Sequence, residues 1–229
     1  MPAITFDNVS VVFDGDISPT LDQVNLELTE HRIGVIGANG SGKSTLARLI
    51  NGLGSPTSGQ VSMDGRDVDK YGREIRRRVG FVFSDAENQI VMPQVRDDVA
   101  FSLRRLKLSR AERDARVDAA LDRFGLTPLA EASPHTLSGG QKQLLALAAV
   151  LVIEPELIIA DEPTTLLDLR NRVRIAREFA ALEQQLIVVT HDLDLLEDFD
   201  RVICLDNGRI IADGNPREVC AHYRGVMLA

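Results

Sequence analysis

The chain lacks several features on which whole classes of protein depend. Its 229 residues include no tryptophan, two tyrosines and two cysteines, Cys204 and Cys220. Two cysteines cannot form the disulfide framework of a small secreted domain, so we expect reduced thiols and a cytoplasmic setting. The longest apolar run, from Leu144 to Ile153, is well short of the ~20 residues that span a bilayer. The first residues also lack the basic region and apolar core of a signal peptide.

Basic charge is scarce relative to acidic charge. The chain has 26 Lys and Arg residues against 34 Asp and Glu residues, a formal net charge of −8. Such a chain is poorly suited to binding nucleic acid over its whole surface, because phosphate neutralisation needs clustered cations. Hydrophobic residues make up 44% and charged residues 26%, which excludes a disordered protein. We expect a single domain over residues 1–229, with room for an insertion.

Strand and helix patterns alternate along most of the sequence, which is typical of an α/β fold with a parallel sheet. Residues 4–28 instead alternate polar and apolar positions, as an antiparallel β subdomain would. Charge is dense and strand patterns are few between about residues 88 and 140, where we expect an inserted helical subdomain. Further buried strands are predicted near 32–36, 79–83, 157–160 and 186–190, helices at 43–53, 140–152 and 169–185, and a hairpin at 202–211.

A phosphate-binding loop is the most informative motif. Residues 37–45 fit the pattern G-x-x-x-x-G-K-[ST] and lie between a predicted strand and a predicted helix. The glycines allow backbone N–H groups to surround an anion, and the helix presents its positive end to it. Lys43 adds a full charge and Ser44 a hydroxyl for Mg²⁺; the alternative is a glycine-rich turn with an exposed lysine. The predicted ATP-binding residues here are Gly37, Asn39, Gly40, Ser41, Gly42, Lys43, Ser44 and Thr45.

Two carboxylates follow the apolar strand predicted at 157–160. Ending a buried strand on Asp161 and Glu162 costs free energy unless the charges meet a cation or water. Asp161 can hold Mg²⁺ together with Ser44 and phosphate oxygens. Glu162 can then orient or deprotonate the water that attacks the γ-phosphate. The alternative is an acidic cap at the start of a loop.

A third motif, Leu137-Ser138-Gly139-Gly140-Gln141, precedes those carboxylates. With this motif in place the chain resembles the ATP-binding-cassette ATPases, whose signature is LSGGQ, over about residues 3–218. The resemblance implies a P-loop NTPase core carrying an antiparallel β subdomain and a helical insert. It also implies head-to-tail dimers, most simply homodimers, in which Ser138, Gly139, Gly140 and Gln141 close over Mg²⁺–ATP held by the other subunit.

The resemblance assigns further roles. His191, after the strand predicted at 186–190, matches the switch histidine that contacts the γ-phosphate or positions the water. Thr165-Leu166-Leu167-Asp168 resembles the loop that crosses the dimer interface, with Asp168 as its acidic residue. Phe13 matches the aromatic that stacks on adenine, although its alternation with Val11 also fits a core residue.

One position departs from the family pattern. A glutamine normally follows the strand predicted at 79–83, where this chain has Ser84. Serine is shorter, so either Gln89 takes over as a metal ligand in a rearranged loop or the Mg²⁺ contact there is weaker. Both alternatives stay open at this stage.

The stretch from Asp85 to Phe101 resembles the ATPases of energy-coupling-factor (ECF) importers, which take up vitamins or transition-metal ions. The short C-terminal region is similar to the ATPase subunit of the biotin importers. The resemblance implies a membrane coupling protein and a small substrate-binding membrane protein as partners, with the ATPase at the cytoplasmic face of the membrane. The alternatives are a conventional ABC importer or exporter, or an ABC ATPase acting on DNA or ribosomes. The absence of a long coiled coil and of a second phosphate loop disfavours the last.

Two basic runs interrupt the acidic sequence, one over residues 73–78 and one over residues 104–110. Each is compatible with a solvated helix face. The alternative is docking to a membrane partner or to nearby anionic lipid.

Overall fold

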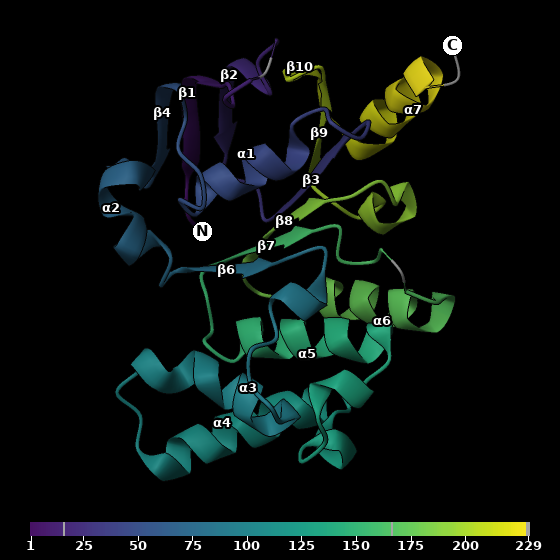
Figure 1. Cartoon of the computed structure of the whole chain (residues 1–229). Helices are drawn as coiled ribbons and strands as arrows, with labels where there is room; N and C mark the ends of the chain where they lie inside the picture. The colour runs from purple at the N-terminus through teal and green to yellow at the C-terminus, as the bar shows by residue number, and fades with distance from the viewer. Residues whose placement is uncertain (16, 166, 228–229) are drawn as a thin grey trace. The chain divides into compact units, whose positions relative to one another are not determined.

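The computed structural model describes residues 1–15, 17–165 and 167–227 (Figure 1). Contacts divide the chain into two compact units. A strand-rich unit consists of Met1–Val79, Glu156–Glu162 and Leu182–Ala229, and a helical unit consists of Gly80–Pro155 and Pro163–Ala181. The helical unit contains residues 88–140, where the insert was expected, and extends beyond them on both sides. In the part of the chain that is described, no helix is both long and apolar enough to cross a bilayer.

An antiparallel sheet forms one layer of the strand-rich unit. Its strand order is β2-β1-β4-β5. Alternate side chains of β1 and β2 are buried, as the polar–apolar alternation predicts. The antiparallel β subdomain is therefore present as expected. Its strands are β1 (Ile4–Val11), β2 (Leu21–Leu28), β4 (Ser58–Met63) and β5 (Arg66–Asp67).

The second sheet of this unit is mainly parallel. Strands β9, β3, β8 and β7 lie side by side in that order with parallel neighbours, and β10 pairs antiparallel with β9. Every residue of β7 and β8 is buried, as in a parallel sheet covered on both faces. The strands are β3 (Arg32–Gly37), β7 (Leu157–Asp161), β8 (Gln185–Val189), β9 (Arg201–Asp206) and β10 (Arg209–Gly214).

The register of this sheet decides where functional residues gather. Val35 of β3 and Asp161 of β7 both pair with Val189 at the end of β8. The carboxyl ends of three parallel strands therefore meet at one edge, which is where open α/β sheets bind ligands. The segments that leave this edge are the loop after Gly37, the pair Asp161–Glu162, and Thr190 with the residues after it.

Helices complete the strand-rich unit. Helix α1 (Lys43–Ile50) contacts both sheets, and α7 (Pro216–Met227) packs on β9 and β10 (Figure 1). Gly52 follows Asn51, the C-cap of α1, and its φ of +65° suits glycine. The hairpin at Asn207–Gly208 forms as predicted, with positive φ at both residues. The remaining helical elements are α2 (Val68–Ile75) and the short 3₁₀ turn η5 (Leu193–Leu196).

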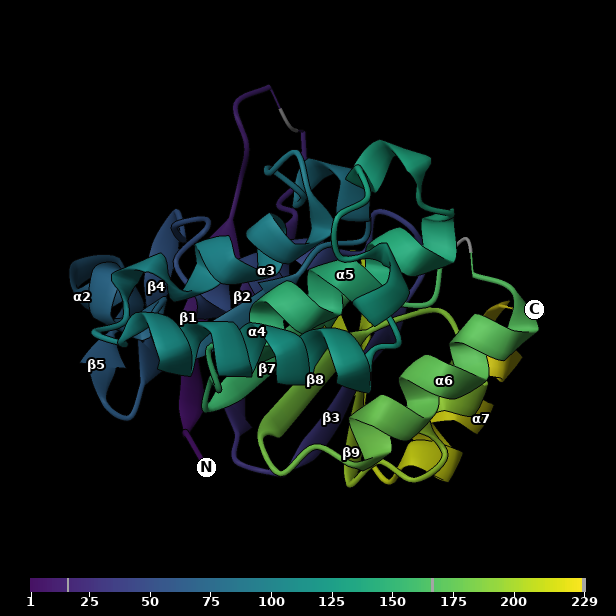
Figure 2. The ribbon, with the colours of Figure 1, turned by 90° about the horizontal axis from the view of Figure 1, so that it is seen from below.

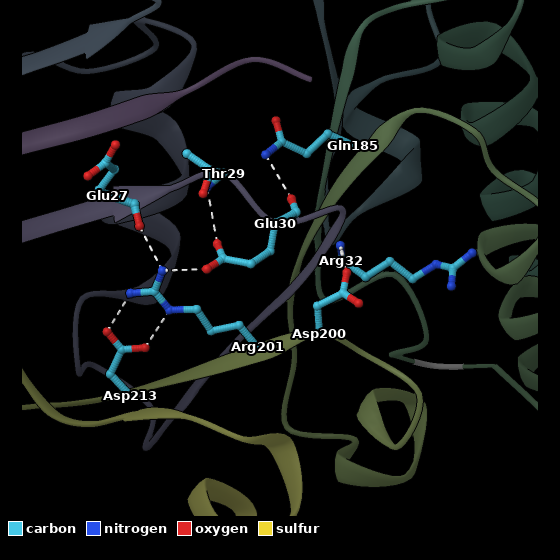
Figure 3. A network of polar contacts seen from close by, with 8 residues as sticks. All are labelled: Glu27, Thr29, Glu30, Arg32, Gln185, Asp200, Arg201 and Asp213. Atoms are coloured by element: carbon cyan, nitrogen blue, oxygen red, sulfur yellow. Dashed lines mark hydrogen bonds and ion pairs between the residues drawn. The ribbon is translucent and has the colours of Figure 1, made fainter.

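A polar network around Arg201 connects the two sheets (Figure 3). The Arg201 guanidinium donates to Asp213 through Nε and Nη2, both at 2.6 Å. Its Nη1 donates to the Glu27 carbonyl oxygen at 2.8 Å and to Glu30 Oε1 at 2.9 Å. Gln185 Nε2 donates to the Glu30 carbonyl oxygen at 2.9 Å. Because Arg201 begins β9 and Gln185 begins β8, the network lies at the sheet edge opposite the one that gathers the motif residues.

In the helical unit, α3 and α4 both contact α5 (Figure 2). Ser109 caps α4 in a capping box with Glu112, as the spacing predicts. Both helices bury one apolar stripe, which includes Val99, Val117 and Leu121. The elements are β6 (Val79–Val82), which leads into the unit, α3 (Val95–Ser102), α4 (Arg110–Arg123), α5 (Gly139–Leu151), α6 (Leu169–Ala180) and the 3₁₀ turns η1 (Ala86–Asn88), η2 (Leu103–Arg105), η3 (Thr127–Leu129) and η4 (Pro134–Thr136).

Three features of the sequence prediction are corrected. Helix α6 ends at Ala180 rather than near residue 185, because Gln185 is fully buried as the first residue of β8. Helix α2 was not predicted; its charged sequence has few apolar positions, and it is fixed by the Asp67 N-cap. Phe13 is 54% exposed beyond the end of β1, so the interpretation of Phe13 as a core residue is wrong. These errors fall where tertiary contacts, rather than local pattern, decide the conformation.

Candidate functional site

The loop from Gly37 to Lys43 has the backbone that an anion cradle needs. Gly37, Gly40 and Gly42 have φ values of +149°, +81° and +100°. A side chain at Gly37 or Gly42 would collide with the carbonyl oxygens of Leu205 or Thr20. Space above Gly40 is open to 4 Å, so a ligand can approach the backbone there. The predicted loop residues Asn39 and Gly40 are exposed, whereas Thr45 is half-buried.

Lys43 is held inside this loop. Its side-chain Nζ donates to the carbonyl oxygens of Gly37 and Ala38, both at 2.9 Å, and the residue is only 7% exposed. Burial lowers the Lys43 pKa, and the charges of Glu162 and Asp161 oppose that shift. A buried ammonium of this kind gains free energy when an anion arrives, as a phosphate would.

Ser41 supplies a further buried polar atom. The residue is 4% exposed, and among the described residues its Oγ has no hydrogen-bond partner. Unpaired buried hydroxyls are rare because each costs free energy. The hydroxyl lies in the loop beside the Gly37 backbone, so a bound phosphate oxygen is a fitting partner.

Ser44 and Asp161 meet at the start of α1. Ser44 Oγ donates to Asp161 Oδ1 at 3.0 Å, and Asp161 is 1% exposed at the end of β7. Burial raises the Asp161 pKa, although the Ser44 hydrogen bond opposes the shift. A hydroxyl and a carboxylate are the hard oxygen donors that Mg²⁺ prefers, and a divalent cation would compensate the buried charge. The residues present therefore fit a magnesium ion.

Glu162 and His191 form a second pair at the same sheet edge. His191 Nδ1 lies 2.8 Å from Glu162 Oε2, and the His191 backbone N–H donates to the same oxygen at 3.4 Å. Glu162 has φ of +51°, held by its backbone N–H donating to the Val189 carbonyl oxygen at 2.8 Å. Such a conformation is uncommon for a residue with a side chain and is found at functional sites. The Glu162 side chain is 17% exposed and that of His191 60%, so water can reach the pair.

The signature residues lie in the helical unit. Ser138 caps α5: its Oγ accepts from the Gln141 backbone N–H at 3.3 Å, and Gln141 Oε1 accepts from the Ser138 backbone N–H at 2.8 Å. Space above Gly139 is open to 4 Å, whereas Gly140 faces the Asn171 side chain so closely that a β-carbon would clash. The motif therefore has an open backbone at one glycine and a packed one at the next.

Asp168 belongs to the same unit. Its Oδ1 accepts from the Asn171 backbone N–H at 2.8 Å, which caps the N-terminus of α6. Because Asn171 also packs on Gly140, the interface loop and the signature share one residue. Leu166 of this loop lies outside the described residues.

Gln89 has a different environment from that of a free metal ligand. Its Oε1 accepts from the Phe83 backbone N–H at 3.1 Å, and its Nε2 donates to the Phe81 carbonyl oxygen at 3.3 Å. Both polar ends of the amide thus hold the chain that leaves β6, while Ser84 is exposed. A metal-binding role for Gln89 remains a prediction, and it would require these two bonds to break.

An ion pair beside the signature was not predicted from the sequence. Lys142 Nζ contacts Glu87 Oε1 and joins the first turn of α5 to η1. Lys142 is the better shielded partner, with a side chain 15% exposed against 67% for Glu87. The signal available in the sequence was its place directly after Gln141, on a turn already fixed by the capping box.

These elements form a candidate site for phosphate and a metal ion at the edge of the parallel sheet of an α/β protein, and comparisons with known proteins identify its class. The family model described as ABC transporter matches residues 21–165. The biotin transport ATP-binding protein BioM of Rhizobium etli is 46% identical over 97% of this chain and 98% of its own length. The energy-coupling factor transporter ATP-binding protein EcfA1 of Halalkalibacterium halodurans is 37% identical over 94% of this chain and 80% of its own length.

A solved structure extends the comparison to the fold. The dimeric ATP-binding cassette MJ0796, in a post-hydrolysis state bound to ADP and Pi, has a TM-score of 0.83 and 30% identity, covering 93% of this chain and 99% of that one. The chain belongs to the ABC transporter family and is an ATP-hydrolysing transporter subunit. The predicted fold class is confirmed.

Proposed function

We propose that this ATPase powers an ECF-type importer whose substrate is a vitamin, with biotin as the first candidate. The observation that carries the proposal is the near full-length similarity to a biotin transport ATP-binding protein at 46% identity. The similarity to an energy-coupling factor ATP-binding protein supports the same class of importer. No residue of the site described above is a candidate ligand for biotin itself, so substrate selection falls to a membrane partner.

The chemistry follows from the residues at the sheet edge. Lys43, held by two loop carbonyls, provides the charge that meets the β and γ phosphates. Ser44 and Asp161 would hold Mg²⁺, which when bound neutralises charge on the phosphate oxygens. Glu162 takes a proton from the attacking water, and His191 orients the Glu162 carboxylate through their 2.8 Å contact.

Two copies of the chain complete the site in this proposal. The open backbone at Gly139 and the hydroxyl of Ser138 lie at the N-terminus of α5, where an anion is favoured. One fold rarely needs two phosphate cradles for one nucleotide, so we infer that each signature closes over ATP bound by the partner subunit. The dimeric cassette bound to ADP and Pi supports this arrangement. Phe13, exposed beyond β1, would stack on adenine, and Asp168 would lie at the dimer interface.

A membrane coupling protein is the proposed second partner. The helical unit contains a cavity of about 480 Å³. Its wall combines apolar side chains with the Glu87–Lys142 ion pair, as a groove for an amphipathic helix would. This docking would hold the ATPase at the cytoplasmic face of the membrane. The cavity is lined by Glu87, Asn88, Ile90, Val91, Met92, Pro93, Pro134, His135 and Lys142.

Co-purification tests the proposal. The affinity-tagged chain is isolated from detergent-solubilised membranes, and uptake of labelled biotin is measured with and without Glu162→Gln. Recovery of a coupling protein and a small substrate-binding membrane protein, with biotin uptake lost in the variant, supports the importer. Recovery of a conventional importer or exporter changes the partner and leaves the ATPase chemistry intact. Recovery of ribosomes or DNA rejects a transport role.

A further inference from the structure

The two basic runs of the sequence differ in the side-chain partners that the structure gives them. In the first, Arg78 pairs with Asp64 at 2.5 Å and with Glu156 at 2.6 Å. Arg76 Nη1 donates to the Gly52 carbonyl oxygen at 3.1 Å. These two arginines of the first run therefore help to hold the strand-rich unit together, whereas Arg73 and Arg77 of the same run are exposed.

The second run, which we call the basic turn, comprises residues 104–110 of the helical unit. Arg104, Arg105 and Lys107 are exposed, and in the described parts of the chain none of the three forms an ion pair with a carboxylate. Arg110 has only a distant carboxylate neighbour, Asp114 at 3.8 Å. The basic turn thus gathers, within four consecutive positions, three exposed cations without an ion pair among the described residues.

Local charge is strongly biased around this turn. Five of the 26 basic residues, but only one of the 34 acidic residues, lie between residues 104 and 113. That acidic residue, Glu112, already accepts from the Ser109 hydroxyl at 2.6 Å and from the Ser109 backbone N–H at 2.8 Å. The patch is therefore positive on a chain whose net charge is −8.

The basic turn is ordered rather than loose. Leu103 is fully buried and anchors η2, and the Leu106 backbone N–H donates to the Leu103 carbonyl oxygen at 3.0 Å. The Arg104 guanidinium lies 3.5 Å from the centroid of the Phe101 ring. Between the cations, the Leu106 side chain is 37% exposed. The surface thus presents fixed positive charges around one apolar side chain.

We propose that the basic turn contacts the anionic headgroups of the membrane. The inference rests on the proposed membrane association and adds a direct lipid contact to the protein partners. Lipid suits the patch better than an acidic protein segment does. The free cations lie on an open turn, and none of them lines the cavity of the helical unit, whereas specific protein recognition usually needs a shaped site. Basic residues beside an exposed leucine are typical of surfaces that rest on anionic bilayers.

Vesicle sedimentation of the full chain tests the proposal. Vesicles of phosphatidylcholine alone are compared with vesicles that also contain phosphatidylglycerol. The patch variant combines Arg104→Gln, Arg105→Gln and Lys107→Gln. A matched control combines Arg73→Gln, Arg77→Gln and Arg217→Gln, which removes the same charge from exposed positions in the strand-rich unit.

The native chain and the control should bind the phosphatidylglycerol vesicles, and added salt should weaken that binding. The patch variant should bind at least about tenfold more weakly, since each cation near an anionic surface contributes to attraction. Its ATPase rate in detergent should equal that of the native chain, which reports that the fold is intact. The proposal is overturned if native binding does not depend on phosphatidylglycerol, or if patch and control variants lose binding equally.

A third result also overturns it and identifies the alternative. If the patch variant binds vesicles normally but no longer co-purifies with its membrane protein, the basic turn contacts protein rather than lipid. Failure of the biotin assignment would leave vesicle binding unchanged, because the uptake assay and the sedimentation assay measure different steps.

Discussion

The strand-rich unit holds two polar clusters at opposite edges of one sheet. In one cluster the charged side chains pair with one another, and in the other burial disfavours the charged forms. At the edge where the parallel strands begin, the hydrogen bonds that Arg201 donates to Asp213 and Glu30 raise the Arg201 pKa. Burial alone would raise the Glu30 pKa, but hydrogen bonds and the Arg201 charge lower it. Where the strands end, burial lowers the Lys43 pKa and raises the Asp161 pKa. One cluster stabilises its own charges, and the other leaves them in need of a ligand.

This difference separates stability from function within one fold. The Arg201 network contributes to folding because every charge in it has a partner before any ligand arrives. The proposed nucleotide site should cost stability until a phosphate meets Lys43 and Ser41 and a cation meets Asp161. Substitutions at the two edges should therefore have opposite consequences for folding and for activity.

The largest effect on activity is expected from Glu162→Gln. Removing the general base should lower the ATP hydrolysis rate by about 10²–10⁴-fold while ATP binding persists. Because ATP is no longer consumed, the ATP-bound dimer should accumulate, which size-exclusion chromatography with and without ATP can measure. Hydrolysis at the native rate would show that Glu162 is not the catalytic carboxylate.

Lys43→Ala should abolish tight nucleotide binding. Loss of one buried charge-assisted contact to phosphate should weaken ATP binding by about 100-fold or more. Fluorescence titration with a labelled ATP analogue measures this, and Lys70→Ala, an exposed lysine in α2, is the matched control. Normal binding in Lys43→Ala would contradict the assignment of the phosphate loop.

Sequence alone predicted the nucleotide edge far better than the Arg201 edge. Ser44 and Asp161 are 117 positions apart. Ser44 lies within the phosphate-loop motif and Asp161 ends the apolar strand β7, so both can be found from local sequence. The carboxyl ends of parallel strands then bring the two together. The Arg201 network instead gathers single residues from β8, β9, β10 and the segment after β2, none of them within a motif. The exposure of Phe13 and the hydrogen-bond partners of Gln89 could not be predicted from the sequence for the same reason, since both depend on tertiary contacts.

Arg201→Met should destabilise the fold without weakening ATP binding. It leaves the Glu30 and Asp213 side chains, which are about 30% exposed, without their cation, at a cost of about 2–3 kcal/mol in the free energy of unfolding. Glu30 has a lowered pKa in the folded state, so its contribution is present above its ordinary pKa and is lost as pH falls through the folded value. Urea denaturation should therefore show that the free energy of unfolding of Arg201→Met differs less from that of the native chain at acidic pH than at neutral pH.

In the ligand-free protein, Asp161→Asn should not lower the free energy of unfolding, in contrast to Arg201→Met. The folded pKa of Asp161 is raised, so the native chain loses stability as pH rises from the ordinary value through the folded one. Replacing the carboxylate should leave stability at neutral pH unchanged or raise it by about 1 kcal/mol, while the Mg²⁺ dependence of hydrolysis is lost. A destabilised variant in thermal unfolding would refute the contrast between the two edges.

The smallest effect is expected in the helical unit, at the Glu87–Lys142 ion pair. This pair is intermediate between the two clusters, because Lys142 is well shielded while Glu87 is mostly exposed. Charge reversal in Glu87→Lys or Lys142→Glu alone should lower ATP hydrolysis about threefold to tenfold by loosening the turn that carries the signature, on the scale of about 1 kcal/mol for such pairs. The double reversal should restore kcat if the pair positions Ser138, and thermal unfolding shows whether the single variants fold. Full activity in both single variants would instead make the pair a surface contact, because a link that positions the signature cannot be broken without slowing the reaction it serves.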